Sequence, residues 1–509
     1  MNSEVNDGLV LISDFTTESV VLIDIDNNIV NSWEVNDYNL LRSYLTPDSI
    51  LVTISKLNNL PVLQKYNWDG LLLWTFIFEE GECLIHHEQV ILPNGNILAI
   101  CKDQISAEEN IYFNEDIVID KIIEIEPLDN DQANIIWEWH FFDHLIQDYD
   151  PNMLNYGIIS ENPQLFNINA YNLLGDFTHL NCVDFNPDLN QIIFSSRSLN
   201  EVFIIDHSTT TEEAKGHIGG IYGKGGDFLY RWGNPINYNR GDLLDQKLHA
   251  PHGVNWINSD YPGGGNILLF DNEYDVSISA IIEFQPPILS NGLYSLDANE
   301  PFEPNEYTWI NHSSNYYSLS HSGAFRMPNG NTLITIFGVP PLYEINIIEI
   351  DNDGILQWEY VGDFITFRAS KYPYPYFSND IQLGDYVYSN TDDVSDFWGT
   401  KNISLSCFTE IQEEYSTNCN IDNFSYLPIA TNFQQPVIIS QYCGRRGYNE
   451  YDPGEGYTPE QFANIRYSSE TDYTGCKNHS ADNYSTNFLI HSNGCIFEGF
   501  SACDVNLDG

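Results

Sequence analysis

Four histidines recur at corresponding places of a repeated pattern, although the chain has only 13 histidines among 509 residues. Each lies shortly before a turn rich in Pro, Asn or Gly: His86, His179, His252 and His321. A fifth imidazole, His87, adjoins the first. A single histidine of this kind would be interpreted as a hydrogen-bonded core residue, but four at matched positions predict a shared site. Converging imidazoles suit either a transition-metal site or a nucleophile flanked by hydrogen-bond donors.

The neighbours of these histidines favour nucleophilic chemistry. His179 and Asn181 are two residues apart, so in a strand both side chains lie on one face. Arg197 ends the next apolar run, IIFSSR. Asn and Arg are donors suited to a tetrahedral oxyanion, whereas a guanidinium is a poor neighbour for a metal cation. We therefore expect a nucleophilic centre and no metal ligands.

These positions belong to a repeat of short β-rich runs. Each unit has an apolar run, a turn with Pro, Asn or Gly, and further apolar runs, the last of which carries a Trp. The turns occupy residues 46–49, 92–96, 186–188, 263–266 and 327–331. The terminal aromatics are Trp33, Trp74, Trp137 or Trp139, Trp232, Trp309 and Trp358. Units of four short strands with an outer aromatic predict an all-β fold, a six-bladed β-propeller over residues 1–377, whose inner strands line a central channel.

The charge of the chain excludes several classes of partner. There are 19 Lys and Arg against 73 Asp and Glu, a net charge of −54. Without a basic surface the protein is not expected to bind nucleic acid or anionic membranes. No apolar run reaches the roughly 18 residues that would predict membrane insertion. Hydrophobic residues make up 42% of the chain, which is enough for a folded core.

Cysteine usage bears on the location of the protein. Six of the nine cysteines fall in the last 103 residues, a density typical of secreted modules: Cys407, Cys419, Cys443, Cys476, Cys495 and Cys503. The first residues lack the basic and apolar regions of a signal peptide. Either the protein is cytosolic or the given sequence omits its natural N-terminus. The cysteines favour an extracellular, cell-surface or periplasmic location.

The composition changes after the repeats, and a Cys-rich, irregular C-terminal region is expected there. Residues 378–474 form a Tyr-, Ser- and Asn-rich extension, and residues 475–509 form a Cys-containing tail of the secretion or anchoring type. The segment 475–495 resembles short disulfide-closed repeats of secreted proteins. The final DVNLDG resembles the opening of an EF-hand or dockerin calcium loop. Because the sequence ends before a twelfth-position Glu, this fragment is not expected to bind calcium by itself.

Several motifs resemble those of the bacterial arylsulfate sulfotransferase family. They are DFTHLN (176–181), SSR (195–197), IDHST (205–209), GDFLYRWGNP (226–235), HAPHGVNW (249–256), SGAFRMPNGNTL (322–333) and RASKYPYPYF (368–377). The resemblance covers residues 1–377. It implies a propeller that moves a sulfuryl group from an aryl sulfate donor to a phenolic acceptor without the nucleotide donor PAPS. The implied route is a sulfohistidine intermediate with ping-pong kinetics and no cofactor.

The same resemblance implies roles for single residues. His252 occupies the place of the nucleophile. His179, Asn181 and Arg197 match the sulfate-binding His, Asn and Arg of the family. The chain departs from the family pattern at some positions, such as Phe177 in place of the usual Trp, but no departure removes a proposed catalytic group.

A second histidine is expected to protonate the leaving phenolate and then to deprotonate the incoming phenol. The candidates are His86 or His87, one of which matches a further channel histidine of the family, and His321, where some members carry a hydroxyl residue. The period of two in a strand allows only one of the adjacent pair to face inward. His86 and His321 both lie seven residues before a Pro, which favours His86. Arg326 could reach the channel or form a salt bridge at the rim.

Some alternatives stay open at this point. Cys83 and Cys101 flank the His86 hairpin and could form a disulfide or remain two buried thiols. Tyr372, Tyr374 and Tyr376 could form an aromatic wall or a rigid connector that closes the propeller. The rival functions are a propeller that binds sulfated or phenolic ligands without turnover, and a metal-dependent sulfatase-like hydrolase. The oligomeric state is left open.

Overall fold

The computed structural model describes residues 5–35, 40–58, 60–79, 81–106, 117–170, 178–338, 345–362, 364–373, 376, 474–475 and 490–491. The chain divides into two compact units, Met1–Thr46 with Ile50–Tyr374, and Pro47–Ser49 with Pro375–Gly509. In the second unit the described elements are β27 (Thr474–Gly475) and β28 (Ile490–His491), which pair in parallel. The six C-terminal cysteines and the calcium-loop-like end lie outside the described residues.

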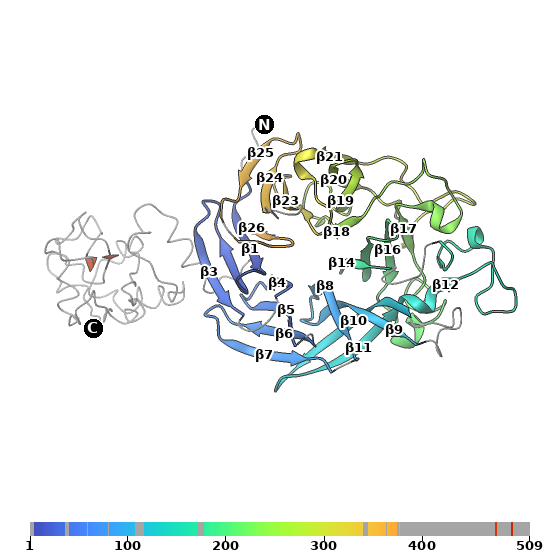
Figure 1. Ribbon diagram of the computed structural model, residues 1–509, viewed down its shortest axis with the longest axis horizontal. Coiled ribbons are helices and arrows are strands. Elements are labelled where there is room, and N and C mark those ends of the chain that lie inside the picture. The colour runs from blue at the N-terminus through green and yellow to red at the C-terminus, as the bar shows by residue number, and fades with distance from the viewer. Residues whose placement is uncertain are drawn as a thin grey trace. The chain divides into compact units, whose positions relative to one another are not determined.

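The first unit is a six-bladed β-propeller, as the sequence predicts, and Figure 1 shows its four-stranded sheets arranged in a ring. Blade 1 contains β26 (Ser370–Pro373), β1 (Gly8–Asp14), β2 (Ser19–Ile23) and β3 (Ile29–Glu34). Blade 2 contains β4 (Arg42–Leu45), β5 (Leu51–Leu57), β6 (Leu60–Tyr66) and β7 (Leu72–Ile77). Blade 3 contains β8 (Leu84–Ile91), β9 (Ile97–Ile105), β10 (Ile117–Leu128) and β11 (Gln132–His140).

The other three blades have the same order of strands. Blade 4 contains β14 (Leu180–Asn186), β15 (Gln191–Ser196), β16 (Glu201–Asp206) and β17 (Tyr230–Trp232). Blade 5 contains β18 (Pro251–Trp256), β19 (Ile267–Asp275), β20 (Ile278–Phe284) and β21 (Trp309–Ser313). Blade 6 contains β22 (Gly323–Arg326), β23 (Thr332–Phe337), β24 (Ile345–Ile350) and β25 (Leu356–Glu359).

In the described part of the chain, helical structure is limited to short segments in the connections. The described helices are α1 (Thr211–Ala214) and the 3-10 turns η1 (Phe141–His144), η2 (Ile159–Glu161), η3 (Pro235–Tyr238) and η4 (Ser314–Tyr316). The connection between blades 3 and 4 also contains a parallel pair, β12 (Leu145–Ile146) and β13 (Phe166–Asn167). Nearly all regular structure of the described residues is β, so the apolar runs of the repeat form strands, as their pattern predicts.

The propeller is closed by pairing of the two ends of its chain. Strand β26 pairs antiparallel with β1, so that Leu9 lies opposite Tyr372. The Tyr372 hydroxyl accepts a hydrogen bond from the backbone N–H of Leu45 in the neighbouring blade, at 2.8 Å. Tyr372 therefore belongs to the closing strand, the second of the two roles that the sequence leaves open. Because this pairing joins residues more than 350 positions apart, nothing local in the sequence indicates it.

The terminal Trp residues seal the seams between blades. Each lies in the outer strand of its blade, as the repeat predicts, and its indole N–H donates to an oxygen of the next blade. The acceptors for Trp33, Trp74, Trp137, Trp232, Trp309 and Trp358 are oxygens of Asn67, Leu128, Thr209, Pro304, Asn352 and Ile25, respectively. A buried Trp needs a partner for its N–H, and the neighbouring blade supplies it. These bonds hold the ring of sheets that positions the inner strands.

Candidate active site

The inner strands bring all five predicted imidazoles to two cavities that share side chains. The smaller cavity, of about 180 Å³, is lined by Leu41, Arg42, Lys56, His86, His87, Glu88, Asn181, His252, His321, Phe367 and Arg368. The larger, of about 420 Å³, is lined by His87, His179, Arg197, His252, Leu319, Ser320, His321, Phe337 and Gly338. His87, His252 and His321 line both. We call the two together the channel site.

Unusual backbone geometry directs these side chains into the channel site. His87, His179 and His321 have positive φ angles of 60°, 40° and 61°, and Ala250, two residues before His252, has 58°. Residues other than Gly rarely adopt this region, and its use concentrates at functional sites. The strand registers also shift here, between Ile85 and Gln89 for example, which is the mark of a β-bulge. Similar shifts lie beside His179 and His252, and they take these side chains out of the alternation of an ordinary strand, whereas His321 precedes a strand with regular register.

This geometry corrects one expectation. A regular strand would let only His86 or His87 face inward, but both line the smaller cavity and His87 alone of the two reaches the larger. The positive φ of His87 breaks the period of two on which the expectation rests. The His87 ring centroid lies 5.1 Å from that of His179, so His87 is the member of the pair that joins the central imidazoles.

His252 is held as a neutral imidazole with a defined tautomer. Its side chain is buried, and Nδ1 lies 3.1 Å from the carbonyl oxygen of Ala250, which can only accept. Nδ1 therefore carries the proton and Nε2 keeps its lone pair. Burial lowers the pKa of His252 well below the ordinary value, and the nearby His321 and the guanidinium of Arg368 lower it further. The arrangement is that of a nitrogen nucleophile at neutral pH.

His321 faces the same space and is surrounded by aromatic rings. Its Nδ1 lies 2.8 Å from the Oγ of Ser320. Its ring stacks on Phe367 at 4.2 Å and lies 4.7 Å from Phe337, and Phe15 stacks on the other side of this group, 4.4 Å from Phe367. Burial lowers the pKa of His321 to about 4, and the positive charge of Arg368 contributes to the shift. The three phenylalanines form an aromatic wall that the sequence does not indicate.

The predicted sulfate-binding residues lie at different depths of the channel site. Asn181 is buried; its amide donates to the Pro251 carbonyl at 2.8 Å and accepts from Ser195 Oγ at 2.6 Å. Arg197 lies at the mouth, where its guanidinium is 3.0 Å from a carboxylate oxygen of Glu273. The carbonyl of His179 accepts from the Arg197 backbone N–H at 3.1 Å, which keeps the two residues together.

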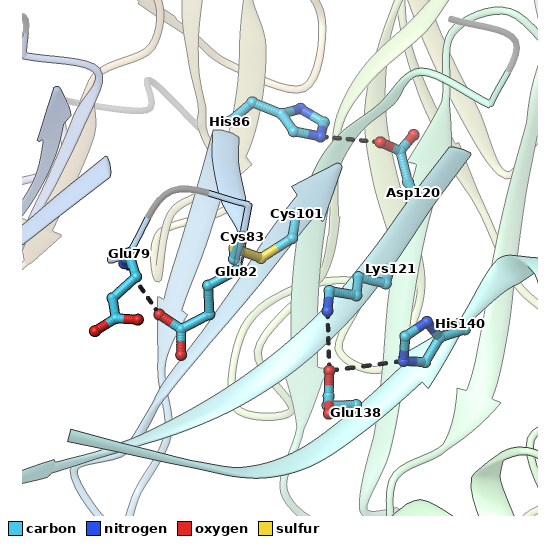
Figure 2. The surroundings of a disulfide bond; sticks show 9 residues. All are labelled: Glu79, Glu82, Cys83, His86, Cys101, Asp120, Lys121, Glu138 and His140. Carbon is cyan, nitrogen blue, oxygen red and sulfur yellow. Dashed lines mark hydrogen bonds and ion pairs between the residues drawn. A yellow bond between two sulfur atoms is a disulfide. The ribbon is translucent and has the colours of Figure 1, made fainter. Parts of the chain in front are cut away.

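A buried carboxylate connects the histidines of blades 3 and 4. Asp120 in β10 lies 3.0 Å from Nε2 of His86 and accepts from the backbone N–H of Leu180, next to His179, at 2.8 Å. Burial alone would raise the pKa of Asp120, but the adjacent imidazole and the ammonium of Lys102 outweigh it and hold that pKa well below its usual range. Figure 2 shows His86 turned toward this carboxylate.

The chain Asp120–His86–His87 sets the tautomer of the last imidazole. With Asp120 ionised, Nε2 of His86 carries the proton, and Nδ1 of His86 lies 2.6 Å from Nδ1 of His87. When His86 is neutral its Nδ1 accepts there, and the proton of His87 is then on Nδ1 and its lone pair on Nε2. Burial and the surrounding imidazoles, His86 first and then His179, lower the pKa of His87 well below the ordinary value.

Behind the imidazoles lies a buried ionic cluster that the sequence does not predict. Glu88 accepts from Nε of Arg42 at 2.9 Å, from the hydroxyl of Tyr44 at 3.0 Å and from the guanidinium of Arg368. The Nε of Arg368 donates to the Ser322 carbonyl at 2.9 Å, beside His321. The sequence carries a weak signal for this cluster, since Glu88 follows the paired histidines and Arg368 opens a family motif in a chain with few basic residues.

Arg326, a candidate for the channel, lies elsewhere. It is absent from the lining of both cavities; its guanidinium pairs with Glu283 and lies 4.9 Å from the Trp309 ring centroid. Arg326 ends β22, whereas His321 precedes the same strand, so the two occupy different depths of the blade. Arg326 therefore forms a salt bridge, the other possibility that the sequence leaves open, but the pair is buried between blades 5 and 6 and is not at the rim.

A disulfide braces the hairpin that carries His86. Cys83 and Cys101 are bonded across 18 residues of sequence, and Figure 2 shows the bridge, which joins the residue before β8 to the middle of β9. Closing this loop restricts the unfolded chain, which stabilises the hairpin. Of the two states that the sequence leaves open for these cysteines, the structure has the disulfide. Cys182, the other cysteine among the described residues, is free and buried.

Comparisons with solved structures give weak overall likenesses. A protein from Lactobacillus plantarum is 10% identical, over 71% of this chain and 82% of that one, with a TM-score of 0.35. A putative 6-phosphogluconolactonase from Bacteroides fragilis is 12% identical, over 71% and 83%, with a TM-score of 0.36. A search of the curated proteins gives no match.

Among the described residues, no helix has the length and apolar character needed to cross a membrane.

A family model gives a specific match. The model described as arylsulfotransferase (ASST) matches residues 1–292, which is more than half of the 509 residues. The matched range includes blades 2 to 4 and reaches beyond β20 of blade 5, and so contains His86, His87, His179, Arg197 and His252. The chain therefore belongs to the arylsulfotransferase (ASST) family.

Proposed function

We propose that the protein transfers a sulfuryl group from an aryl sulfate to a phenolic acceptor through a covalent intermediate on Nε2 of His252. The observation that carries this proposal is the state of that imidazole: it is buried, neutral, and bound through Nδ1 to the Ala250 carbonyl, so its other nitrogen is free to attack. Membership of the arylsulfotransferase family supports the reaction class. No nucleotide takes part in this scheme.

The first half-reaction breaks one bond and forms one. Nε2 of His252 attacks sulfur, the bond between sulfur and the phenolic oxygen breaks, and its electron pair leaves with the phenolate. The three remaining oxygens share negative charge throughout, and Arg197, Asn181 and His179 are the donors assigned to them. In a water-poor cavity each such donor typically contributes about 10²–10³-fold to the rate. The second half-reaction reverses these steps with the acceptor phenol.

His87 is the acid and base in this scheme. Its lone pair on Nε2, set by Asp120 and His86, is available to take the proton of the acceptor phenol. Binding of an anionic donor favours protonated imidazoles nearby, because an opposite charge within a few ångströms raises their pKa. A proton taken up with the donor then passes to the leaving phenolate. His321, with its lowered pKa and aromatic neighbours, is assigned to binding instead.

The aromatic wall supports an aryl substrate. Phe337 and Phe367 flank His321 at the cavities, and offset aromatic pairs contribute roughly 0.5–1.5 kcal/mol beyond the burial of their area. The chain has a net charge of −54, so groups close to the site must attract the anionic donor. In physiological salt the repulsion from distant carboxylates is screened beyond about 8–10 Å. Arg197 lines the larger cavity and supplies a positive charge within that distance.

The disulfide supports a proposal about location. Cys83 and Cys101 are bonded in the first unit, and such bonds persist in oxidising compartments and are rare in the cytosol. We propose that the protein works outside the cytoplasm, at the cell surface, in the periplasm or in the medium. Non-reducing peptide mapping of protein isolated from its own cells would test this, and a free Cys83 thiol would contradict it.

The full chain should release nitrophenolate from p-nitrophenyl sulfate only when a phenol acceptor is present. We expect double-reciprocal plots at several acceptor concentrations to be parallel, because a ping-pong reaction releases the first product before the acceptor binds. Release without acceptor that stops with a chelator would indicate metal-dependent hydrolysis. Tight binding of the sulfate without any release would indicate a propeller that only binds.

Substituting His87 by glutamine should slow transfer from phenyl sulfate by about 10²–10⁴-fold, the usual contribution of a general acid or base. The loss should be much smaller with p-nitrophenyl sulfate, because nitrophenolate leaves without a proton. The ratio is measured as kcat/KM for each donor, because in a ping-pong reaction this quantity depends only on the first half-reaction and not on deprotonation of the acceptor. His321→Gln should lower both rates alike, and His312→Gln, on the exposed part of β21, should change neither. An equal loss for both donors in His87→Gln would refute the role in proton transfer.

A further inference from the structure

A second group of imidazoles lies outside the channel site, between the outer strands of blades 3 and 4. His144 ends η1, directly after β11, while His217 and Asp227 belong to the segment between α1 and β17. One ligand atom from each of the three lies within 4.8 Å of the others. None of them lines either cavity of the channel site. The proposed sulfuryl transfer leaves this cluster without a role.

The hydrogen bonds of His144 leave one nitrogen facing a carboxylate. Its Nε2 lies 2.8 Å from the carbonyl oxygen of Ala214, which can only accept, so Nε2 carries a proton. Its Nδ1 lies 3.0 Å from Oδ1 of Asp227. In a neutral imidazole this places two lone pairs against each other in a fully buried position. A cation between them, either a proton or a metal ion, resolves that conflict.

His217 approaches the same carboxylate oxygen from the solvent side. Its Nδ1 lies 2.7 Å from Oδ1 of Asp227, and its side chain is 51% exposed. Three ligand atoms thus surround one point, two on buried residues and one on a half-exposed residue through which an ion could arrive. Tetrahedral zinc with ligands at about 2.0 Å needs ligand atoms roughly 3.3 Å apart. The two distances to Oδ1 of Asp227, 3.0 and 2.7 Å, would have to lengthen by roughly 0.3 and 0.6 Å. The two imidazole nitrogens, which lie within 4.8 Å of each other, would have to approach the ion, and the half-exposed His217 is the side chain with room to move.

The surroundings hold the buried ligands in place. The Trp139 ring stacks on His144 at an interplanar angle of 3°, and its indole N–H donates to the Gly226 carbonyl at 2.8 Å. Gly226 precedes Asp227, and a Cβ there would lie 2.6 Å from Nε2 of His144, so only glycine allows this approach. A backbone carbonyl that orients a ligating histidine is the usual outer partner in metal sites.

We propose that His144, His217 and Asp227 bind a divalent transition-metal ion of the zinc class through Nδ1, Nδ1 and Oδ1. Two imidazoles and a carboxylate suit zinc, and an exogenous ligand or water completes four-coordination. The ion links the end of blade 3 to the glycine-rich segment that leads into β17 of blade 4. Its role is to stabilise that segment, and sulfuryl transfer does not involve it.

The test is the metal content of the untagged full chain after incubation with Zn²⁺ and desalting. We expect about one equivalent by elemental analysis, a transition temperature higher by about 3–5 °C than in EDTA-treated protein, and tetrahedral d–d absorption after Co²⁺ substitution. His217→Ala, at a half-exposed position, should fold normally and bind Zn²⁺ at least about 10-fold more weakly. His312→Ala is the matched control and should bind as the wild type does.

A proton between His144 and Asp227 is the competing arrangement. It predicts no bound zinc, no effect of Zn²⁺ or EDTA on the transition temperature, and no difference between His217→Ala and His312→Ala. Any of these results would overturn the proposal. Nitrophenolate transfer should persist in EDTA at a temperature where the apoprotein stays folded, which separates this site from the channel site.

Discussion

Replacing His252 by alanine is expected to lower sulfuryl transfer by at least about 10⁴-fold, since loss of a nucleophile removes the covalent route altogether. His252 is buried and bonded through Nδ1 to a carbonyl, which leaves Nε2 as the attacking atom, and alanine has no nitrogen to take its place. Initial rates with p-nitrophenyl sulfate and phenol measure the loss. The His312→Ala variant, which removes an exposed imidazole from β21, should keep wild-type activity.

Two further measurements separate a nucleophile from a structural histidine. Mass spectrometry of donor-treated wild-type protein should find the mass of one sulfuryl group on the peptide that contains His252, and the His252→Ala peptide should lack it. Added imidazole, which can occupy the space left by the side chain, should restore part of the turnover. A sulfated peptide elsewhere, or full activity in His252→Ala, would disprove the assignment.

Replacing Glu88 by glutamine is expected to lower the free energy of unfolding of the propeller by about 3–5 kcal/mol, as happens when one partner of a buried ion pair is removed. Glu88 accepts from Arg42 and Arg368, whose guanidiniums would both remain buried without a counter-charge. Because Arg42 belongs to blade 2 and Arg368 lies just before the closing strand β26, the loss falls on the closure of the ring.

The effect should depend on pH in a definite direction. Burial raises the pKa of Glu88, but Arg42 and Arg368 outweigh it and lower that pKa below its ordinary value. The stabilisation is therefore complete above the pKa of the unfolded carboxyl, about 4.3, and is lost as the pH falls through the lower folded value. Urea midpoints of wild type and Glu88→Gln should differ most near neutral pH and converge in acid.

Glu359→Gln, at an exposed position, is the matched control and should lower the free energy of unfolding by less than about 1 kcal/mol. Equal midpoints for Glu88→Gln and wild type at pH 7 would contradict the prediction.

The repeat itself is legible in the sequence because its determinants are local. A Pro, Asn or Gly turn sets each hairpin, and a Trp ends each unit because its indole must reach the next blade. Trp33 and Trp358 show the principle at both ends of the ring: the outer strand of blade 1 bonds to blade 2, and that of blade 6 bonds back to blade 1. Six such units predict six blades.

The candidate site is less predictable, and the failures have physical causes. The period of two favours His86, but with a positive φ at His87 both histidines line the channel site and His87 reaches further into it. Such backbone strain is stabilised by the surrounding tertiary structure rather than by the local sequence. Arg326 and Arg368 both follow a Phe, yet one pairs with Glu283 between blades 5 and 6 and the other with Glu88 beside the imidazoles.

What the sequence by itself determined is the set of strands, the number of blades and the identity of the histidines at the channel, since turns, alternation and repeat positions are properties of neighbouring residues. Only the tertiary structure decided which imidazoles face one another, which arginine joins them, and how β26 closes the ring against β1. These contacts join residues up to 365 positions apart, as Gly8 and Pro373 show. Their partners are selected by burial and charge after the blades have met, so no local pattern encodes them.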